Sequence, residues 1–264
     1  MAKSKHYYIR RTHRYLGLIL GIQFLFWTIS GLYFSWTNID EIHGDFQHKH
    51  LPPLTSGIHL ISPDSVFKQV SDKPVAINSI QLISILQKPF YSINYTDKKD
   101  AKNILADAAT GTLRKPITKE EAIQIATESY NGKPLIKSAE YITSTNGHHE
   151  YREKPLPAWA ITFEHSTNTT VYVSAEQGKV ESFRNNKWRI FDFLWMGHTM
   201  DYQSRDNINN WLLRIFSAFG LITVLSGFVL FFISRKKRGS KYINKNNKPV
   251  DEIHDQPSSQ NDSE

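Results

Sequence analysis

The stretch that decides the fold is RRTHRYLGLILGIQFLFWTISGLYFSW, residues 10–36, in which a basic cluster containing His13 stands directly before a long apolar run. No side chain between Tyr15 and Ile39 is charged. A helix over 15–36 would be about 33 Å long, enough to cross a hydrocarbon core of about 30 Å. The run is too long for the apolar part of a cleaved signal peptide, and bulky residues follow it where a cleavage site would need small ones. We therefore expect a transmembrane helix over 15–36.

A second uncharged run, IFSAFGLITVLSGFVLFFIS (215–234), ends directly on the basic sequence RKKR. Trp211 and Arg214 precede it, where an indole can lie in the membrane interface and an arginine can reach the headgroups. Two such runs, each flanked by basic residues on the same topological side, are not typical of the core helices of a soluble protein. The pattern predicts a second transmembrane helix over 211–234.

The net charge of +7 comes entirely from the two ends of the chain. Residues 1–14 contain five Lys or Arg and residues 235–248 contain seven, with no acid in either segment, whereas 15–234 is neutral. The positive-inside rule then places the basic segment 1–14 and the tail 235–264 in the cytoplasm, and residues 37–210 on the extracytoplasmic side of the cytoplasmic membrane. The tail is polar from about residue 245 and is predicted to be disordered. A nucleic-acid partner is not expected, because the folded part carries no basic excess.

The composition also limits the chemistry. The chain has no cysteine, which excludes disulfides, zinc–thiolate sites, iron–sulfur clusters and cysteine nucleophiles. We find no zinc-protease, serine-hydrolase, P-loop or dinucleotide motif. No catalytic residue is therefore predicted, and a hydrolase would need a site without a recognised motif.

Two stretches of the long central segment resemble each other. YSINYTDKKDAKNILADAATGTL (91–113) and WAITFEHSTNTTVYVSAEQGKV (159–180) each contain two alternating segments separated by a polar turn, then a second turn at Gly111 or Gly178. Alternation of apolar and polar residues is typical of half-buried antiparallel strands. Each stretch therefore predicts a β-hairpin.

A helix start precedes each hairpin. Ser62 is a candidate N-cap before Pro63, and Thr118 with Glu121 forms the pattern of a capping box. The buried side of the second helix is predicted to be Ala122, Ile123, Ile125 and Ala126. Residues 37–186 are thus predicted to form an α+β domain of two helix-plus-antiparallel-hairpin units, about 62–115 and 117–183. In each unit we expect a helix, a strand and a hairpin in that order. Residues 187–210 are expected to form an interfacial helix and connector, with Trp188, Phe191, Leu194 and Trp195 in the headgroup region.

These elements resemble a known family. The helix start ITKEEAIQIA (117–126) and the turns DAATGTL (107–113) and SAEQGKV (174–180) resemble PepSY-domain membrane proteins, and HRYLGLILG (13–21) and LWMGHTMDY (194–202) resemble the PepSY-associated transmembrane helix. The resemblance covers about residues 8–236. It implies a duplicated PepSY-like α+β domain flanked by two transmembrane helices. Some members of the family are peptidase propeptide or regulatory domains, and others, with more spans than this chain, are haem-containing reductases of iron–siderophore uptake.

Three histidines are candidate ligands of haem b. On a helix, His13 lies on one line with the small residues Gly17, Gly21, Thr28 and Gly31. Such a strip is typical of close helix packing, between the two spans or between subunits, but it could also accept a flat macrocycle with His13 as axial ligand.

The other two candidates, His43 and His198, border the two spans on the opposite side of the membrane. They could hold a haem between them, or form a metal site with Asp40, Asp45 or Asp201. The sequences HKH (48–50) and HH (148–149) lie in polar surroundings and are expected to be solvated loops.

Two hypotheses about function remain open. The first is a haem-linked component of envelope redox chemistry or iron–siderophore uptake, which requires a homodimer or a partner membrane protein to complete the site at His13; as an enzyme it would be part of a ferric-chelate reductase. The second is a non-catalytic, membrane-anchored binding or regulatory module, whose sheet edge or groove binds a peptide or an envelope protein. In both, the spans are embedded in the lipid bilayer.

Overall fold

The computed structural model describes residues 5–70, 76–97 and 100–243. The chain divides into two compact units. The first contains the described residues up to Phe24 and from Arg214 onward, and the second contains Leu25–Leu213. The expected disorder after residue 245 falls outside the described residues.

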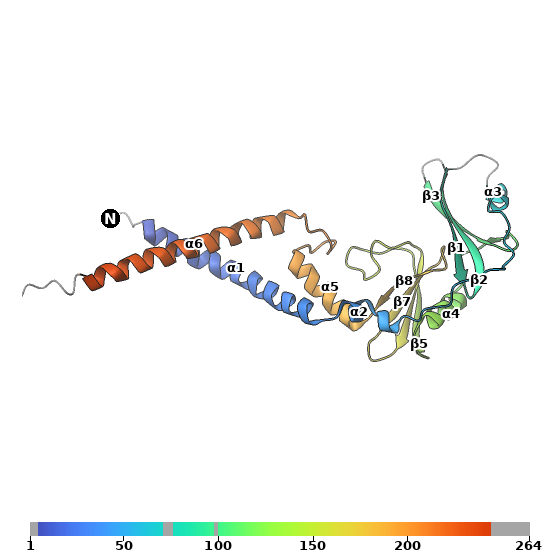
Figure 1. Ribbon diagram of the computed structural model, residues 1–264, viewed down its shortest axis with the longest axis horizontal. Helices are drawn as coiled ribbons and strands as arrows, with labels where there is room; N and C mark the ends of the chain where they lie inside the picture. The colour runs from blue at the N-terminus through green and yellow to red at the C-terminus, as the bar shows by residue number, and fades with distance from the viewer. Residues whose placement is uncertain (1–4, 71–75, 98–99, 244–264) are drawn as a thin grey trace, which may run out of the picture. The chain divides into compact units, whose positions relative to one another are not determined.

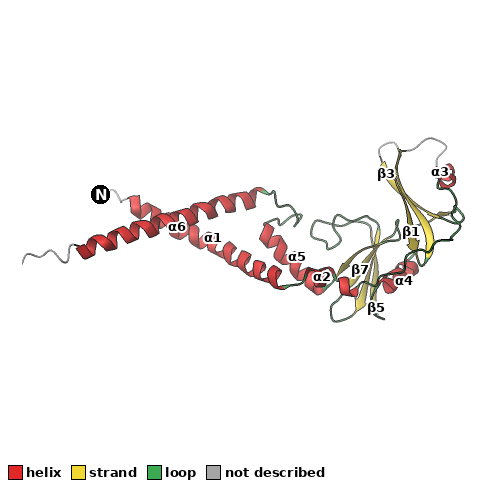
Figure 2. Cartoon of the chain, in the orientation of Figure 1, coloured by secondary structure: helices red, strands yellow, loops and turns green. Residues whose placement is uncertain are grey.

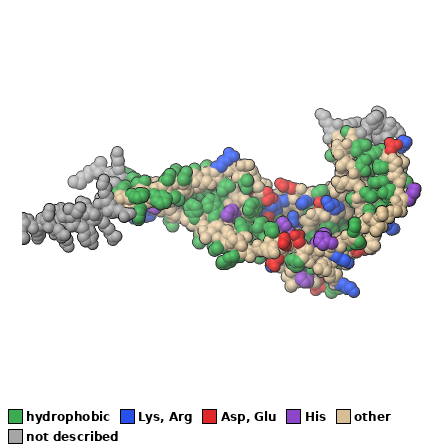
Figure 3. Space-filling model, viewed as in Figure 1, with side chains coloured by type: hydrophobic (Ala, Val, Ile, Leu, Met, Phe, Trp, Pro, Cys, Tyr) green, Lys and Arg blue, Asp and Glu red, His purple; other side chains and the backbone are tan. Residues whose placement is uncertain are grey.

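Two long helices, α1 (Lys5–Trp36) and α6 (Trp211–Ile243), account for the two apolar runs. The segments Tyr7–Trp36 and Trp211–Ile233 are long and apolar enough to cross a membrane, with mean hydropathies of 1.6 and 2.3. Only 11% and 6% of these apolar windows are buried, whereas a core helix of a soluble protein would be mostly buried. Apolar side chains cover much of the two helices in the space-filling view (Figure 3).

The helices are longer than the predicted spans. α1 begins at Lys5 rather than at Tyr15, so the basic cluster is itself helical. Lysine and arginine favour helix nearly as well as leucine does, and a helix has no reason to end at a membrane surface. In the same way α6 continues beyond residue 234, as far as Ile243.

The second unit contains two antiparallel sheets (Figures 1 and 2). In the first, β1 (Ala76–Ile85), β2 (Lys88–Asp97), β3 (Asp100–Asp107) and β4 (Leu113–Arg114) pair in chain order, after the short helix α3 (Asp64–Val70). α3 contributes Val66 to a small core with Tyr91 and Ile93 of β2 and Ala106 of β3. The helix starts just after Ser62 and Pro63, close to the predicted position.

The second sheet repeats this order. Its strands β5 (Leu135–Ile142), β6 (Ala158–Glu164), β7 (Thr170–Ser174) and β8 (Val180–Arg184) follow the helix α4 (Lys119–Ser129). The predicted capping box is present: the Thr118 hydroxyl accepts from the Glu121 amide, and the Glu121 carboxylate accepts from the Thr118 amide. Ala122, Ile125 and Ala126 are buried, and Ile123 packs against the core beside them.

The two sheets share details below the level of strand order. The first strand of each has a register shift near its start, at Ile77/Ser79 and at Ile136/Ser138. Gly111 and Gly178 both adopt positive φ, of 77° and 65°, in the turn before the last strand, which explains the glycine at each position.

Four backbone hydrogen bonds around these turns also correspond. In the first half they are Asp107 N to Thr112 O (3.0 Å), Ala108 N to Pro89 O (3.0 Å), Gly111 N to Asp107 O (2.7 Å) and Ile61 N to Ala108 O (2.9 Å). In the second half they are Ser174 N to Lys179 O (2.9 Å), Ala175 N to Pro157 O (3.0 Å), Gly178 N to Ser174 O (3.0 Å) and Ile117 N to Ala175 O (2.8 Å).

A common core joins the two sheets. Ile85, Phe90 and Leu105 of the first sheet pack with α4 and with Ile161 and Phe163 of the second. A side chain at Gly178 would overlap Ile85, so the β7–β8 turn lies directly on the end of β1. The α+β domain therefore folds as one body with two sheets.

Two further helices connect this domain to the apolar helices. α2 (Ile39–His43) follows α1 and buries Ile42, and α5 (Asn186–Thr199) follows β8. Asn185 caps α5 by accepting from the Trp188 amide at 2.8 Å, and its own amide group donates to the Glu41 carbonyl at 3.1 Å. Lys187 also forms an ion pair with Glu41, so the start of α5 is fixed to α2.

Candidate functional site

His13, in the first unit, is bonded to a serine of α6. Its Nδ1 lies 2.7 Å from the Ser226 hydroxyl, which itself donates to the Thr223 carbonyl at 2.8 Å. Because the hydroxyl proton is used on that carbonyl, the serine oxygen accepts from His13, and Nδ1 carries the proton. The neutral ring then has its lone pair on Nε2, for which the described residues show no partner.

His198, in the second unit, makes the same arrangement with a serine of α1. Its Nδ1 lies 2.8 Å from the Ser30 hydroxyl, which donates to the Trp27 carbonyl at 3.1 Å. The tautomer follows by the same argument, and Nε2 again has no partner among the described residues. Ser30 is fully buried.

Aromatic rings surround His198. Trp195 stacks on it with ring centroids 6.3 Å apart and planes at 8°, and Phe34 meets it edge-on at 5.6 Å. The Trp27 indole donates to the His198 carbonyl at 2.8 Å, and a side chain at Gly197 would overlap Phe26. Burial lowers the pKa of His198 below the usual value of 6.5, so the imidazole is held in its neutral form.

The other side of α5 is fixed by charge pairs. Asp192 is buried and pairs with Arg152 at 2.8 Å and with Arg205. Arg189 makes a two-point bond to Glu150, at 2.7 and 2.9 Å. The helix that carries His198 is thereby clamped to the loop after β5 and to the segment after α5.

This clamp changes the expected role of α5. The guanidinium carbon of Arg184 lies over the Trp188 ring, 4.0 Å from the centroid of that ring. Phe191 and Trp195 pack on Phe34. These rings therefore contact protein rather than only headgroups. The exposed apolar side chains of α5 are instead Ile190 and Phe193.

The glycine strip of α1 is open. A Cβ placed on Gly17, Gly21 or Gly31 would have no atom within 4 Å, so these glycines do not pack against another described segment. The close approach in the first unit instead involves glycines of α6, because Gly220 faces Phe24 and Gly227 faces His13. Close packing between the two spans of one chain therefore does not explain the strip.

The remaining candidate histidines make other contacts. His43 ends α2 and is exposed, and no hydrogen bond or ring contact joins it to His198 in the described part of the chain. The rings of His48 and His50 lie side by side on the surface, with their centroids 5.8 Å apart. His149 accepts from the Tyr151 amide at 3.0 Å and holds the turn there.

Asp201 is occupied by its own loop. Although burial opposes its ionisation, hydrogen bonds from the Ser204 hydroxyl and from the amides of Asn207, Ser204 and Gln203 lower the pKa of Asp201. Within residues 5–70, 76–97 and 100–243, no group of three or more His, Asp or Glu side chains could hold a metal ion.

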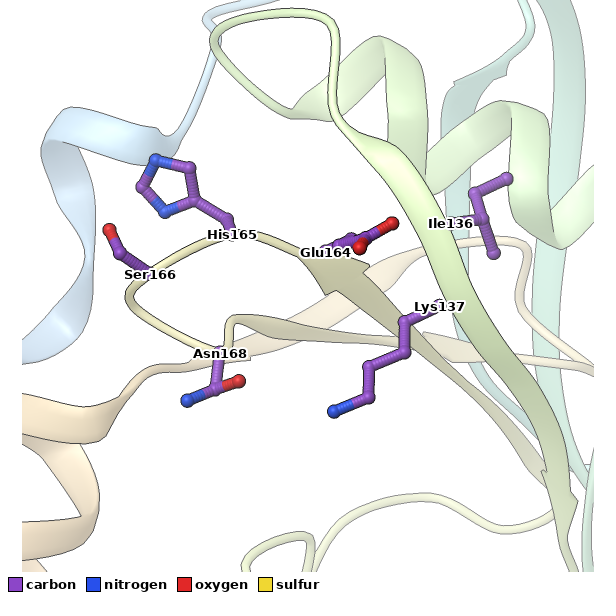
Figure 4. Close-up of a pocket in the computed structure, with 6 residues that line it drawn as sticks. All are labelled: Ile136, Lys137, Glu164, His165, Ser166 and Asn168. Carbon is purple, nitrogen blue, oxygen red and sulfur yellow. The ribbon is translucent and has the colours of Figure 1, made fainter.

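Two hollows lie on the second unit. One, of about 480 Å³, is lined by α5 and the loop after β5, including Arg184, Trp188 and Trp195. The other, of about 570 Å³, is lined by Lys137, Glu164 and His165 at the edge of the second sheet. Figure 4 shows the His165 ring and the Lys137 ammonium group pointing away from each other.

Sequence reasoning found both histidines but missed their partners. Ser30 and Ser226 are each one of several polar residues within an apolar run, and a serine in a transmembrane helix commonly bonds to its own backbone. The sequence does indicate that each serine has a partner, because a polar side chain within an apolar helix needs one. Which partner it finds depends on contacts 168 and 213 residues apart in the chain.

Comparison with known proteins identifies the family. The model described as PepSY-associated TM region matches residues 10–251, and the chain belongs to this family. The family predicted from the sequence motifs is therefore confirmed, as is an α+β region flanked by two candidate membrane-spanning helices. No curated protein and no solved structure matches the chain.

Proposed function

From this membership, we propose that the protein lies in the cytoplasmic membrane as a two-span protein, with both termini in the cytoplasm and the α+β domain on the extracytoplasmic side. The proposal is supported by the basic clusters before α1's apolar run and after α6's. We further propose that the α+β domain arose by duplication of a helix-plus-sheet unit. The shared strand order and the corresponding turn hydrogen bonds support this.

We also propose that the protein is a haem-linked component of envelope redox chemistry, in the context of iron or siderophore uptake. The observation that carries this proposal is the state of His13 and His198. Each has Nδ1–H bonded to a serine and Nε2 left with a free lone pair. A neutral imidazole oriented through its other nitrogen is the form in which histidine binds iron.

The surrounding residues fit such a group. Gly17 and Gly21 follow His13 by one and two helical turns and leave open space beside α1, as a flat macrocycle requires. The Thr223 hydroxyl, three residues before Ser226, is buried and has no partner among the described residues. Haem b, when bound, would supply one-electron transfer.

The chain's own contribution would be to orient and shield the ligands. Ser226 and Ser30 fix the tautomer of the two rings, and the aromatic rings around His198 partly bury it, which favours the neutral imidazole. Each site offers one described imidazole. A second imidazole for the same haem would come from another copy or from a partner membrane protein.

The visible spectrum tests the haem proposal. The full-length protein, made with ample haem and purified in mild detergent, should show a Soret band and, when reduced, an α band. His13→Ala and His198→Ala should each lower the haem content per chain, whereas the exposed His43→Ala should not. A protein that stays colourless, or whose spectrum is unaffected by both substitutions, would contradict the proposal.

The second candidate function is a membrane-anchored binding module. It is favoured by the first sheet, which exposes an uncharged edge strand, β1, suited to pairing with another strand. A colourless protein that still captures an envelope protein or peptide through its α+β domain would support this function instead. Capture should then be lost when charges are placed on β1.

A further inference from the structure

The outer edge of β1 is unprotected. β1 is the outermost strand of the first sheet, and no segment within the described ranges pairs with its outer side. Its ten residues, AINSIQLISI, include neither a charge nor a proline. Natural sheets usually protect so long an edge with charged residues, prolines, bulges or a covering segment. The register shift between Ile77 and Ser79 affects only the start of β1, and Ser79–Ile85 pair regularly with β2.

The second sheet provides a direct comparison. β5 occupies the same position in its sheet as β1 does in the first, and it carries Lys137 and Glu140. One of two edges with the same topology is thus charged and the other is not. Of these two edges, β1 is therefore the one that lacks charged residues.

The side chains of β1 extend an existing core. Ile80 lies opposite Ile93 and Leu82 opposite Tyr91, and these two partners are buried in the core that α3 covers. Ile80 and Leu82 themselves are 42% and 44% exposed. The apolar core of the first sheet therefore continues to its edge and ends there uncovered.

We propose that β1 pairs antiparallel with β1 of a second copy of the chain, about a two-fold axis at Gln81. Residues opposite each other in an antiparallel ladder point to the same face, so a symmetric strand pair must place one residue opposite itself. Centring on Gln81 places Ile80 opposite Leu82 of the second copy, and Leu82 opposite its Ile80. An axis at Ile80 would instead place Leu82 opposite Asn78 of the second copy, and an axis at Leu82 would place Ile80 opposite its Ser84.

A copy of the same chain suits this edge for two reasons. An uncharged strand meets an identical one without like-charge repulsion. Two chains anchored in one membrane are also confined and oriented, which raises their effective concentration and makes a small interface sufficient. The pairing does not rest on haem binding, although a second copy would bring a second imidazole for each histidine.

Disulfide trapping tests the register, because the natural chain has no cysteine. Across the axis the two Gln81 Cα atoms would lie about 5 Å apart, within the range of a disulfide. The matched control is Ser84→Cys, on the same strand and also exposed. In the proposed register, the two Ser84 residues are separated by about 20 Å. Mild oxidation in membranes should give roughly tenfold more disulfide dimer for Gln81→Cys than for Ser84→Cys.

A charge exchange distinguishes pairing from random collision. In the Gln81→Cys background, Ile80→Lys alone should abolish the dimer, because an unpaired ammonium group would enter the apolar interface. Adding Leu82→Glu should restore it, because each lysine then lies opposite a glutamate of the second copy. The melting temperature of each variant shows that the domain remains folded.

Two results would overturn the proposal. One is equal dimer formation by Gln81→Cys and Ser84→Cys, and the other is a dimer that persists unchanged in Ile80→Lys. The haem proposal is judged separately by the visible spectrum, so a colourless protein that still forms the Gln81 disulfide would support this inference and contradict that one.

Discussion

Ser30 and Ser226 have the same chemical role at two places in the structure. Each hydroxyl donates to the carbonyl three residues before it and accepts from an imidazole Nδ1. Serine suits this position because its single proton is used by the helix backbone and its lone pairs remain for a donor. The hydroxyl therefore determines the tautomer of the histidine, and with it the nitrogen that can bind iron.

Removing one hydroxyl should loosen α5 from α1. Ser30→Ala leaves the partly buried Nδ1–H of His198 without its acceptor, which costs up to about 1–3 kcal/mol. The matched control is Ser35→Ala, because the Ser35 hydroxyl bonds to the Leu32 carbonyl on the same helix but contacts no imidazole. Hydrogen exchange of the α5 amides should become faster in Ser30→Ala and stay unchanged in Ser35→Ala. Equal exchange in the two variants would show that the bond to His198 does not hold the helix.

The same contact should depend on pH. Burial lowers the pKa of His198 below 6.5. Between the pKa of the folded and that of the unfolded state, His198 is therefore neutral in the folded protein but protonated in the unfolded chain. Stability from this group is therefore complete above the unfolded pKa and decreases as the pH falls below it. The melting temperature should decrease between about pH 7.5 and pH 5, and His198→Gln should reduce this decrease. His43→Gln, which changes an exposed ring, should leave it unchanged; a decrease identical in all three proteins would contradict the assignment.

At the scale of elements, two sides of α5 contact other parts of the protein. One carries Phe191, Trp195 and His198 against α1, and the other carries Asp192 against Arg152 and Arg205. The charged side anchors the helix to the α+β domain, so the position of His198 depends on ion pairs that are remote from its ring.

Breaking that anchor should be costly. The Asp192 side chain is 5% exposed and its partner Arg152 is 9% exposed. Asp192→Asn removes the charge from a buried pair and should destabilise the domain by about 3–5 kcal/mol. Asp64→Asn breaks the exposed pair with Lys68 and should cost less than about 1 kcal/mol. Thermal unfolding followed by tryptophan fluorescence compares the two variants, and a similar loss in both would show that burial of the pair is unimportant.

The elements that the sequence predicts well are those whose signals are local. The capping box at Thr118 and the positive-φ turns at Gly111 and Gly178 are each contained within a few residues, and each is present in the structure. A strand between the helix and the hairpin is predicted in each unit, where β1 and β5 lie, but the residues of these strands are not predicted, because their burial pattern does not alternate cleanly and both are edges. Edge strands bury one side against a single neighbour, so their periodic signal is weak.

The candidate site was predictable only in part, because it depends on contacts between distant segments. His13 and His198 could be identified from their positions beside apolar runs. That His43 and His198 hold a haem between them stays a prediction; in the structure His198 contacts Trp27, Ser30 and Phe34. A sequence gives no direction to a side chain at the end of a helix, and the aromatic packing of α5 determines it here.

At the scale of the whole molecule, the neutral α+β domain and the basic ends of the chain predict its orientation in the membrane. Because the natural chain lacks cysteine, a single introduced thiol reports the side on which it lies. Tyr141→Cys on the exposed face of β5 should react with a membrane-impermeant maleimide in intact spheroplasts. Lys3→Cys, in the basic segment before the first apolar run, should react only after the membrane is opened. Both variants should stay with the membrane in alkaline carbonate, which strips peripheral proteins. The reverse labelling pattern would place the α+β domain in the cytoplasm. The basic clusters would then lie on the outer face, against the distribution of lysine and arginine that orients other membrane proteins.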